Sequence, residues 1–185
     1  MKQFWTVCAI VLLAALVAFP SSALAQDNAW HQKDMVISAG IGIGLAGLYG
    51  TSSLPPIYVG FETGIAEKIT LGGNIGYAGS SEDFLDGSWK YSYIPIEVRG
   101  AYHFLDHNPK IDAYGGIGIG YVIVSNSVTY TNPLIQQFSF SASGSYTFFD
   151  IFAGARYYFS PKFGAHVEVG YGLGFARIGV DYKLN

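Results

Sequence analysis

The stretch FFDIFAGARYYFSPKFGAHVEVGYGLGFARIGVDYKL, residues 148–184, decides the fold. Three runs separated by tight turns make it up: 148–159, 163–171 and 176–184. In each run, apolar residues occupy every second position, and glycine or charged residues fill most of the positions between them. Successive side chains of a β-strand point to opposite sides of the sheet, so each run has one apolar and one polar face. The three runs are therefore predicted to be consecutive strands.

The composition of the polar face indicates which face is buried. In a soluble barrel the apolar face points inward, whereas in a transmembrane barrel it meets lipid and the polar face lines the interior. A solvated outer face usually carries Lys, Glu, Ser and Thr, but here repeated glycines accompany residues such as Arg156, Glu168 and Asp181. This pattern favours a narrow interior and a membrane barrel. A soluble barrel of lipocalin type is the alternative, and it would require the apolar set to face inward.

The same alternation recurs earlier in the chain. Five further strands are predicted at 35–45, 57–64, 69–77, 91–104 and 111–123. Short turns are expected at 66–68, 105–110 and 160–162, and longer polar loops at 51–56, 79–88 and 125–146. Outer-membrane barrels have short periplasmic turns and longer external loops, which would make both termini periplasmic. The predicted fold class is all-β, an eight-stranded antiparallel up-and-down transmembrane β-barrel preceded by a cleavable signal peptide.

The first residues have the features of a secretory signal peptide. Lys2 precedes an apolar run at 4–19, and Ala23 and Ala25 form an A-x-A cleavage site. The predicted organisation is a signal peptide at 1–25 and an outer-membrane β-barrel domain at 26–185. The single cysteine, Cys8, would leave with the signal peptide. Without Lys2, nine basic residues oppose thirteen acidic ones, a net charge of −4 that argues against nucleic acid as a partner.

Four segments carry a family resemblance: YIPIEVR at 93–99, AYGGIGIGY at 113–121, GARYYF at 154–159 and EVGYG at 168–172. With the closing strand, they make the chain resemble the small outer-membrane β-barrels of the opacity-protein and OmpX-like family. The resemblance implies a surface protein of the Gram-negative cell envelope, surrounded by outer-membrane lipid and lipopolysaccharide. It also implies periplasmic chaperones and the barrel-insertion machinery as partners during assembly. It implies no shared reaction.

An eight-stranded barrel is just wide enough for side chains to fill, which disfavours a diffusion pore. The inward face is expected to hold a structural network of ionic side chains: Glu62, Glu97, Arg99, Arg156, His166, Glu168, Arg177 and Asp181. Glu168 is predicted to bridge Arg156 and Arg177. A small ion-conducting pore or a proton path through this network is the alternative.

Enzymatic function finds little support in the sequence. A lipid-modifying enzyme of deacylase type is expected to carry a His-x-Ser pair, yet Leu105 and Glu168 stand at that position after His103 and His166. A metal site of His166, Glu168 and Asp181 lacks a second converging histidine. No cofactor is expected. The predicted function is a non-enzymatic structural or surface-interaction role, similar to adhesion or opacity proteins, with a lipid-modifying outer-membrane enzyme as an alternative.

The best candidate for a partner site is the connection at 125–146. Alternation on both of its sides predicts that two strands continue beyond the membrane as a protruding hairpin, although a disordered surface loop is the competing interpretation. The candidate binding residues are Tyr130, Pro133, Phe138 and Phe140, and the expected partner is an extracellular protein or a host surface.

Overall fold

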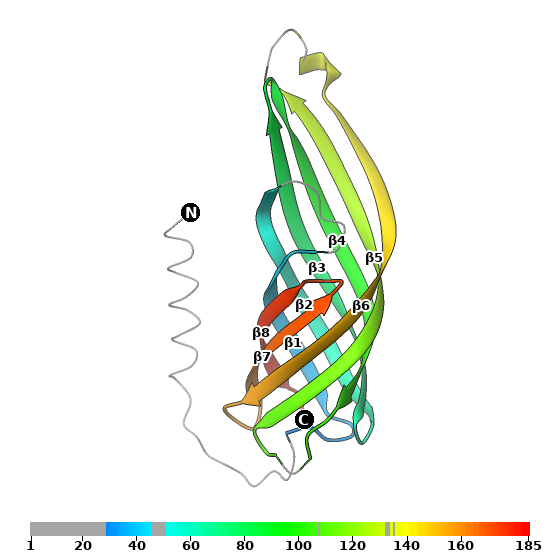
Figure 1. Cartoon of the computed structure of the whole chain (residues 1–185), viewed down its shortest axis with the longest axis vertical. Coiled ribbons are helices and arrows are strands. Elements are labelled where there is room, and N and C mark those ends of the chain that lie inside the picture. Colours follow the sequence, from blue (N-terminus) through cyan, green and yellow to red (C-terminus); the bar gives the residue numbers. More distant parts are fainter. Residues whose placement is uncertain (1–28, 46–50, 107, 132–133, 135) are drawn as a thin grey trace.

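The computed structural model describes residues 29–45, 51–106, 108–131, 134 and 136–185, so the predicted signal peptide and Pro133 lie outside the described residues. The described chain forms a closed antiparallel barrel in which each strand pairs with the next and β8 pairs with β1 (Figure 1). Its strands are β1 Met35–Ile43, β2 Thr51–Ala66, β3 Ile69–Phe84, β4 Gly87–His103, β5 Ile111–Tyr130, β6 Phe140–Tyr158, β7 Phe163–Tyr171 and β8 Ala176–Lys183. A short 3-10 helix, η1 Gln136–Phe138, precedes β6. Among these residues, none of the helical segments is long and apolar enough to cross a membrane.

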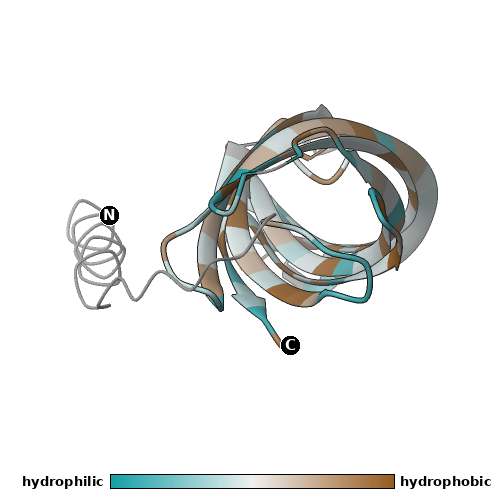
Figure 2. Ribbon diagram, turned by 90° about the horizontal axis from the view of Figure 1, so that it is seen from below, coloured by the Kyte–Doolittle hydropathy of each residue, from teal (hydrophilic) through white to brown (hydrophobic). Residues whose placement is uncertain are grey.

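The predicted eight-stranded barrel is confirmed, and viewed along its axis it is a ring of strands with alternating hydropathy (Figure 2). Strand β7 illustrates the two faces. Val167 and Val169 expose more than half of their surface on the outside, at 56% and 62%. The alternate residues of the same strand, His166 and Glu168, are buried in the lumen. The apolar face therefore points outward, as a membrane barrel requires.

Glycines on the inward face allow the strands and large side chains to approach closely. A Cβ atom on Gly116 would lie 2.1 Å from the backbone oxygen of Gly100 on the neighbouring strand. A Cβ atom on Gly120 would lie 2.2 Å from the Phe148 ring. Both distances are far below van der Waals contact, so these positions need glycine for steric reasons.

Two predicted loops are in fact strand. Residues 51–56 belong to β2, where register shifts surround Leu54 and the two prolines that follow it. Most of 79–88 belongs to β3 and β4, whose pairing continues to Phe84↔Gly87, so that only two residues connect them. Residues 51–56 contain two serines and two prolines, and residues 79–88 are rich in Ser, Gly and acidic residues, which is why both segments were expected to form loops.

The predicted protruding hairpin is confirmed as a structural element. Strands β5 and β6 stay paired as far as Val128↔Phe140, whereas β7, β8 and β1 are short and end near the barrel rim (Figure 1). We call the protruding part the extension; it comprises residues 79–84 of β3, 87–92 of β4, 124–130 of β5 and 140–147 of β6. With about 3.4 Å per residue and a strand tilt of about 40°, it rises about 18 Å beyond the last apolar outward residue of β5.

Pro95 lies within β4, with its side chain buried in the barrel. The β3–β4 ladder has no paired residues between Ile75↔Ile96 and Ala78↔Tyr93, yet the register on both sides is the same. Proline has no N–H to donate, so the interruption coincides with the bond that it cannot make. The strand continues without a bulge.

Candidate functional site

The lumen brings all eight predicted ionic residues together in a buried cluster. Glu62, Glu97, Arg99, Arg156, His166, Glu168, Arg177 and Asp181 each expose less than a tenth of their surface. Two further carboxylates, Asp112 and Asp150, join them. Buried charges must be paired, and the arrangement of these pairs decides whether the lumen can do anything besides hold the barrel together.

Glu168 is the centre of the upper half of this cluster. Arg99 donates two hydrogen bonds to its carboxylate, from Nη1 at 3.2 Å and Nη2 at 2.8 Å. The Tyr114 hydroxyl donates a third at 3.1 Å, and Nη2 of Arg177 forms an ion pair with the other side. The guanidinium of Arg99 also lies 3.4 Å from the centre of the Phe152 ring. This carboxylate therefore joins strands β4, β5, β7 and β8 across the lumen.

The expected bridge from Glu168 to Arg156 was wrong, whereas the bridge to Arg177 is present. Arg156 lies lower in the lumen, where Nε donates to Asp181 at 2.9 Å and Nη2 donates to Glu62 at 3.2 Å. In the β6–β7 ladder the partner of Arg156 is His166, two residues away from Glu168. Arg99 from β4, and not Arg156, binds Glu168. In a narrow barrel, a side chain from the opposite wall of the lumen is as near to Glu168 as one from the adjacent strand.

A second hydrogen-bonded chain surrounds Asp181. Its carboxylate accepts a bond from the Ser38 hydroxyl at 2.6 Å and lies 3.0 Å from Nδ1 of His166. Nε2 of the same ring lies 2.5 Å from the Tyr58 hydroxyl. All polar atoms of this His166 ring are thus engaged by protein groups. Among the described residues, there is no group of three or more His, Cys, Asp and Glu side chains suited to holding a metal ion.

The end of the lumen next to the short turns is filled by the segment preceding β1. Trp30 is buried and stacks on His103, with ring centroids 4.6 Å apart and an angle of 11° between the planes. Nζ of Lys183 donates to the backbone oxygen of Ala29 and to Asp34, each at 2.8 Å. Sequence analysis missed this closure because these residues lie before the first alternating run.

The opposite end of the cluster is covered by an apolar layer. Leu45 and Leu173, from the loops after β1 and β7, are almost fully buried there. They pack with inward residues of the long strands, namely Tyr58, Ala78, Tyr93, Val122 and Phe148. Together with Trp30 at the other end, this layer leaves the charged cluster between two plugs of apolar side chains.

Beyond this layer, the extension presents the candidate partner residues. Phe138 and Phe140 expose 62% and 52% of their surface at its far end. Tyr130 is partly buried, and its ring packs edge-on against Phe84 with centroids 5.8 Å apart. Thr131 N donates to the backbone oxygen of Asp86 at 2.7 Å, which ties the β5–β6 hairpin to the β3–β4 hairpin. The tips of the two hairpins therefore form one surface.

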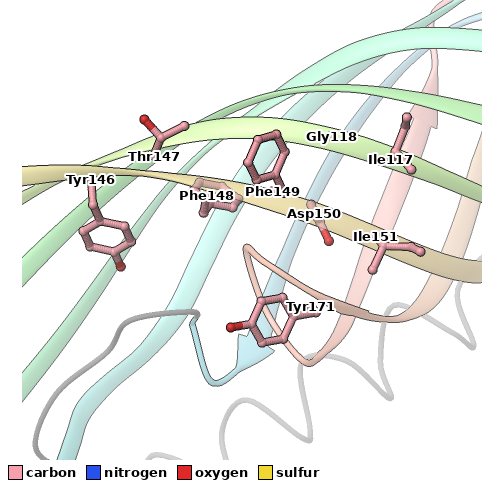
Figure 3. A pocket seen from close by; sticks show the side chains of 9 residues that line it. All are labelled: Ile117, Gly118, Tyr146, Thr147, Phe148, Phe149, Asp150, Ile151 and Tyr171. Carbon is pink, nitrogen blue, oxygen red and sulfur yellow. The ribbon is translucent and has the colours of Figure 1, made fainter.

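The extension has an open strand edge on β6. Pairing of β6 with β7 ends at Ile151↔Tyr171, so residues 140–150 of β6 have β5 as their only described strand neighbour. A cavity of about 590 Å³ lies where β6 separates from β7. Side chains from both strands and from β5 surround it, including Tyr146, Phe149 and Tyr171 (Figure 3). The edge is uncharged from Phe140 to Phe149 and contains no proline.

A closed eight-stranded barrel with an apolar exterior and a filled polar lumen defines the class of bacterial outer-membrane barrels. The family comparison agrees: the outer membrane protein beta-barrel domain model matches residues 11–185. The chain belongs to this family and is an outer-membrane protein of a Gram-negative bacterium. A search of curated proteins found no match.

Two structures of Ail show the same fold. Ail, the attachment invasion locus protein of Yersinia pestis, in complex with the heparin analogue sucrose octasulfate, is 14% identical with a TM-score of 0.52; the match covers 82% of this chain and 96% of Ail. Ail solved without that compound gives 16% identity and a TM-score of 0.50, over 82% and 95% of the two chains. The N-terminal β-barrel domain of Pseudomonas aeruginosa OprF is 18% identical, with a TM-score of 0.45 over 84% and 100%.

Proposed function

We propose that this protein is a non-enzymatic surface-interaction protein that binds an extracellular protein or a host surface through its extension. The open edge of β6 carries the proposal. Exposed strand edges can accept a partner's strand, and proteins normally protect them with charged residues, proline, bulges or covering segments. Residues 140–149 contain no charged residue and no proline, so they lack the first two of these protections.

The closed lumen supports the non-conducting part of the proposal. A permeating ion would have to displace the Trp30 plug and the apolar layer with Leu45 and Leu173, and also separate the ion pairs between them. Planar-bilayer recordings test this point, and a steady single-channel conductance of the native protein would contradict it. Mass analysis of lipid A from expressing cells tests the enzymatic alternative, for which we expect no change.

The same architecture supports an orientation in the membrane. We infer that both termini and the short turns at 66–69 and 158–163 face the periplasm, with the extension outside the cell. The signal peptide at 1–25 would be removed on export, and periplasmic chaperones and the insertion machinery would deliver the mature chain to a membrane containing lipopolysaccharide. Protease accessibility on intact cells tests the orientation, because only the extension should then be cleaved.

Charge on the extension indicates the kind of partner. Glu82, Asp83 and Asp86 lie around its tip, and Lys90 is the basic residue among its described strands. Ail has been solved with a sulfated compound, but an acidic tip would repel a polyanion of that kind. We therefore infer a neutral or basic protein segment as the partner.

Binding of expressing cells to host cells or immobilised matrix proteins tests the function. Gly144 lies in the open edge, and a Cβ atom there would meet nothing within 4 Å. Gly144→Lys should therefore leave the barrel intact while blocking strand addition, and Gly144→Ala is the matched control. Binding should fall for the lysine variant and for a deletion of residues 130–140. Undiminished binding in both would exclude the extension as the binding element.

A further inference from the structure

The outward face of the barrel changes its chemistry at one level. On β5 the outward residues Ile117, Ile119, Tyr121 and Ile123 are followed, on the same face, by Ser125. On β4 the change falls between Ile94 and Ser92. On β6 it falls between Phe149 and Thr147. Below this level the outer face is apolar and meets lipid; above it, the same face continues as the outer face of the extension.

Above this level nearly every outward side chain of β4, β5 and β6 carries a hydroxyl group. The outward residues on β4, β5 and β6 are Ser88, Lys90, Ser92, Ser125, Ser127, Thr129, Ser141, Ser143, Ser145 and Thr147. They form direct cross-strand rows, since Ser92 pairs with Ser125 and Ser125 pairs with Ser143. Adjacent strands lie about 4.8 Å apart, so the hydroxyl groups form a regular array. Lys90 is the single charged residue among these positions, and on β3 the same face adds Ser81 and, opposite Ser88, the carboxylate of Asp83.

The inward face of the extension lacks this abundance of Ser and Thr residues. Its inward residues include Trp89, Tyr91, Val128 and Phe140, and the rings of Trp89 and Tyr91 stack with centroids 6.2 Å apart. Polarity is therefore inverted relative to the membrane-spanning part, where the outside is apolar and the inside polar. The hydroxyl groups are confined to the face that adjoins the lipid surface.

Two tyrosines at the top of the apolar band turn their hydroxyl groups toward the array. Tyr77 donates a hydrogen bond to Oγ of Ser92 at 3.1 Å, and Tyr121 donates one to Oγ of Ser145. Each serine then accepts from a tyrosine and keeps its own O–H available as a donor. Tyrosine is enriched at the boundary between hydrocarbon and headgroups, so these two pairs mark that boundary.

We propose that the outer face of the extension is a docking surface for the neutral sugar residues of lipopolysaccharide molecules in the same outer leaflet. The surface is continuous with the lipid-facing band, so the molecules nearest to it are those whose acyl chains contact that band. Hydroxyl groups both donate and accept, as sugar hydroxyls do, whereas phosphate and acidic sugars call for Lys or Arg. A face meant only for water would normally carry more charge. The proposal does not depend on strand addition at β6.

The test compares the full mature protein in vesicles of two compositions. One contains phospholipid with lipopolysaccharide truncated after its acidic inner sugars, and the other contains lipopolysaccharide with neutral core sugars. Binding to the native state alone raises stability, so the urea midpoint should be higher with the neutral sugars, by about 0.5 M or more. Equal midpoints in the two vesicle types would overturn the proposal without any variant.

Variants identify the surface. Ser125→Ala, Ser141→Ala and Ser143→Ala combined remove three exposed hydroxyl groups without affecting a lumen contact. In this triple variant the urea midpoint should no longer be higher with the neutral core sugars. With truncated lipopolysaccharide, its midpoint should equal that of the native protein. Ser52→Ala with Ser53→Ala, exposed serines on β2, should retain the rise. If the triple variant kept the higher urea midpoint, this face would not be the docking surface. If lipid-free core oligosaccharide added to phospholipid vesicles raised the urea midpoint equally, the ligand would not be a membrane glycolipid. Host-cell binding by the same variant should be unchanged, which separates this inference from the proposed function.

Discussion

Substitution of Glu168 by glutamine should destabilise the barrel strongly, because this carboxylate is shared by two buried arginines. Glutamine has nearly the same shape, but its NH₂ group is a hydrogen-bond donor. It would face the N–H groups of Arg99 or Arg177, which also donate, so one of these contacts would be lost. Breaking a buried ion pair by removing one partner typically costs about 3 to 5 kcal/mol. Both arginines keep another carboxylate, since Arg99 Nε lies 3.6 Å from Glu62 and Arg177 Nη2 lies 3.0 Å from Asp150. The lower end, about 3 kcal/mol, is therefore expected.

The measurement is urea unfolding of the protein in phospholipid vesicles, followed by the heat-dependent mobility shift in SDS. With a urea dependence of about 1 to 3 kcal/mol per molar, the loss of about 3 kcal/mol corresponds to a midpoint lowered by about 1 to 3 M. Glu97→Gln is the matched control. Glu97 accepts a hydrogen bond from Asn74 at 2.8 Å, and Nη1 of Arg177 lies 3.8 Å from its carboxylate. Glutamine can still accept from Asn74, so this variant should lose less than about 1.5 kcal/mol.

Three outcomes would refute this reasoning. An unchanged midpoint for Glu168→Gln would mean that the carboxylate does not hold the two arginines. Equal losses for both variants would mean that the burial of an amide, rather than the shared ion pair, sets the cost. A larger loss for Glu97→Gln would reverse the assignment of the central carboxylate.

Two further predictions concern the barrel wall and the Trp30 plug. Gly116→Val should prevent folding, because the valine side chain would overlap the backbone of Gly100. The variant should then lose the heat-dependent mobility shift, whereas Gly144→Ala, the control, should keep it. Trp30→Ala should lower the urea midpoint by an amount equivalent to about 3 kcal/mol, since it removes a buried ring stacked on His103, and an unchanged midpoint would contradict the plug.

The membrane-spanning strands could be predicted because each residue there has only two environments, lipid or lumen. Strand β7 was predicted with both of its observed ends, Phe163 and Tyr171, since its alternation is unbroken and turn residues bound it. The inward position of Glu168 follows from the same parity. Its main partner could not be predicted in the same way. Counting residues from a turn shows which residues of two neighbouring strands lie at the same level, but Arg99 reaches Glu168 from a strand on the other side of the lumen. That contact depends on the stagger of the whole closed sheet.

The extension was harder to predict because its polarity is reversed. The outward Ser and Thr residues of β3 to β6, taken with nearby glycines, suggest a loop, and 79–88 was expected to be one. Yet the parity of β5 does not change: the β5–β6 ladder runs from Ile111↔Tyr157 to Val128↔Phe140 without a register shift. Inward and outward positions can therefore be followed along the strand even where the preference for apolar residues moves from one face to the other.

This reversal locates the membrane boundary within the sequence itself. On β5 it lies between Ile123 and Ser125, and the residue paired with Ser125 on β4 is Ser92, the outward residue next to Ile94 on the side of the extension. Two strands thus change at positions that face each other in the ladder, although neither sequence alone identifies the level. A soluble hairpin would have no reason to exchange its two faces midway, whereas a strand leaving lipid must do so as its outer face becomes polar and its inner face loses the ionic lumen. The reversal is therefore independent physical support for a membrane barrel, and it separates the part of β5 that holds the barrel from the part available for recognition.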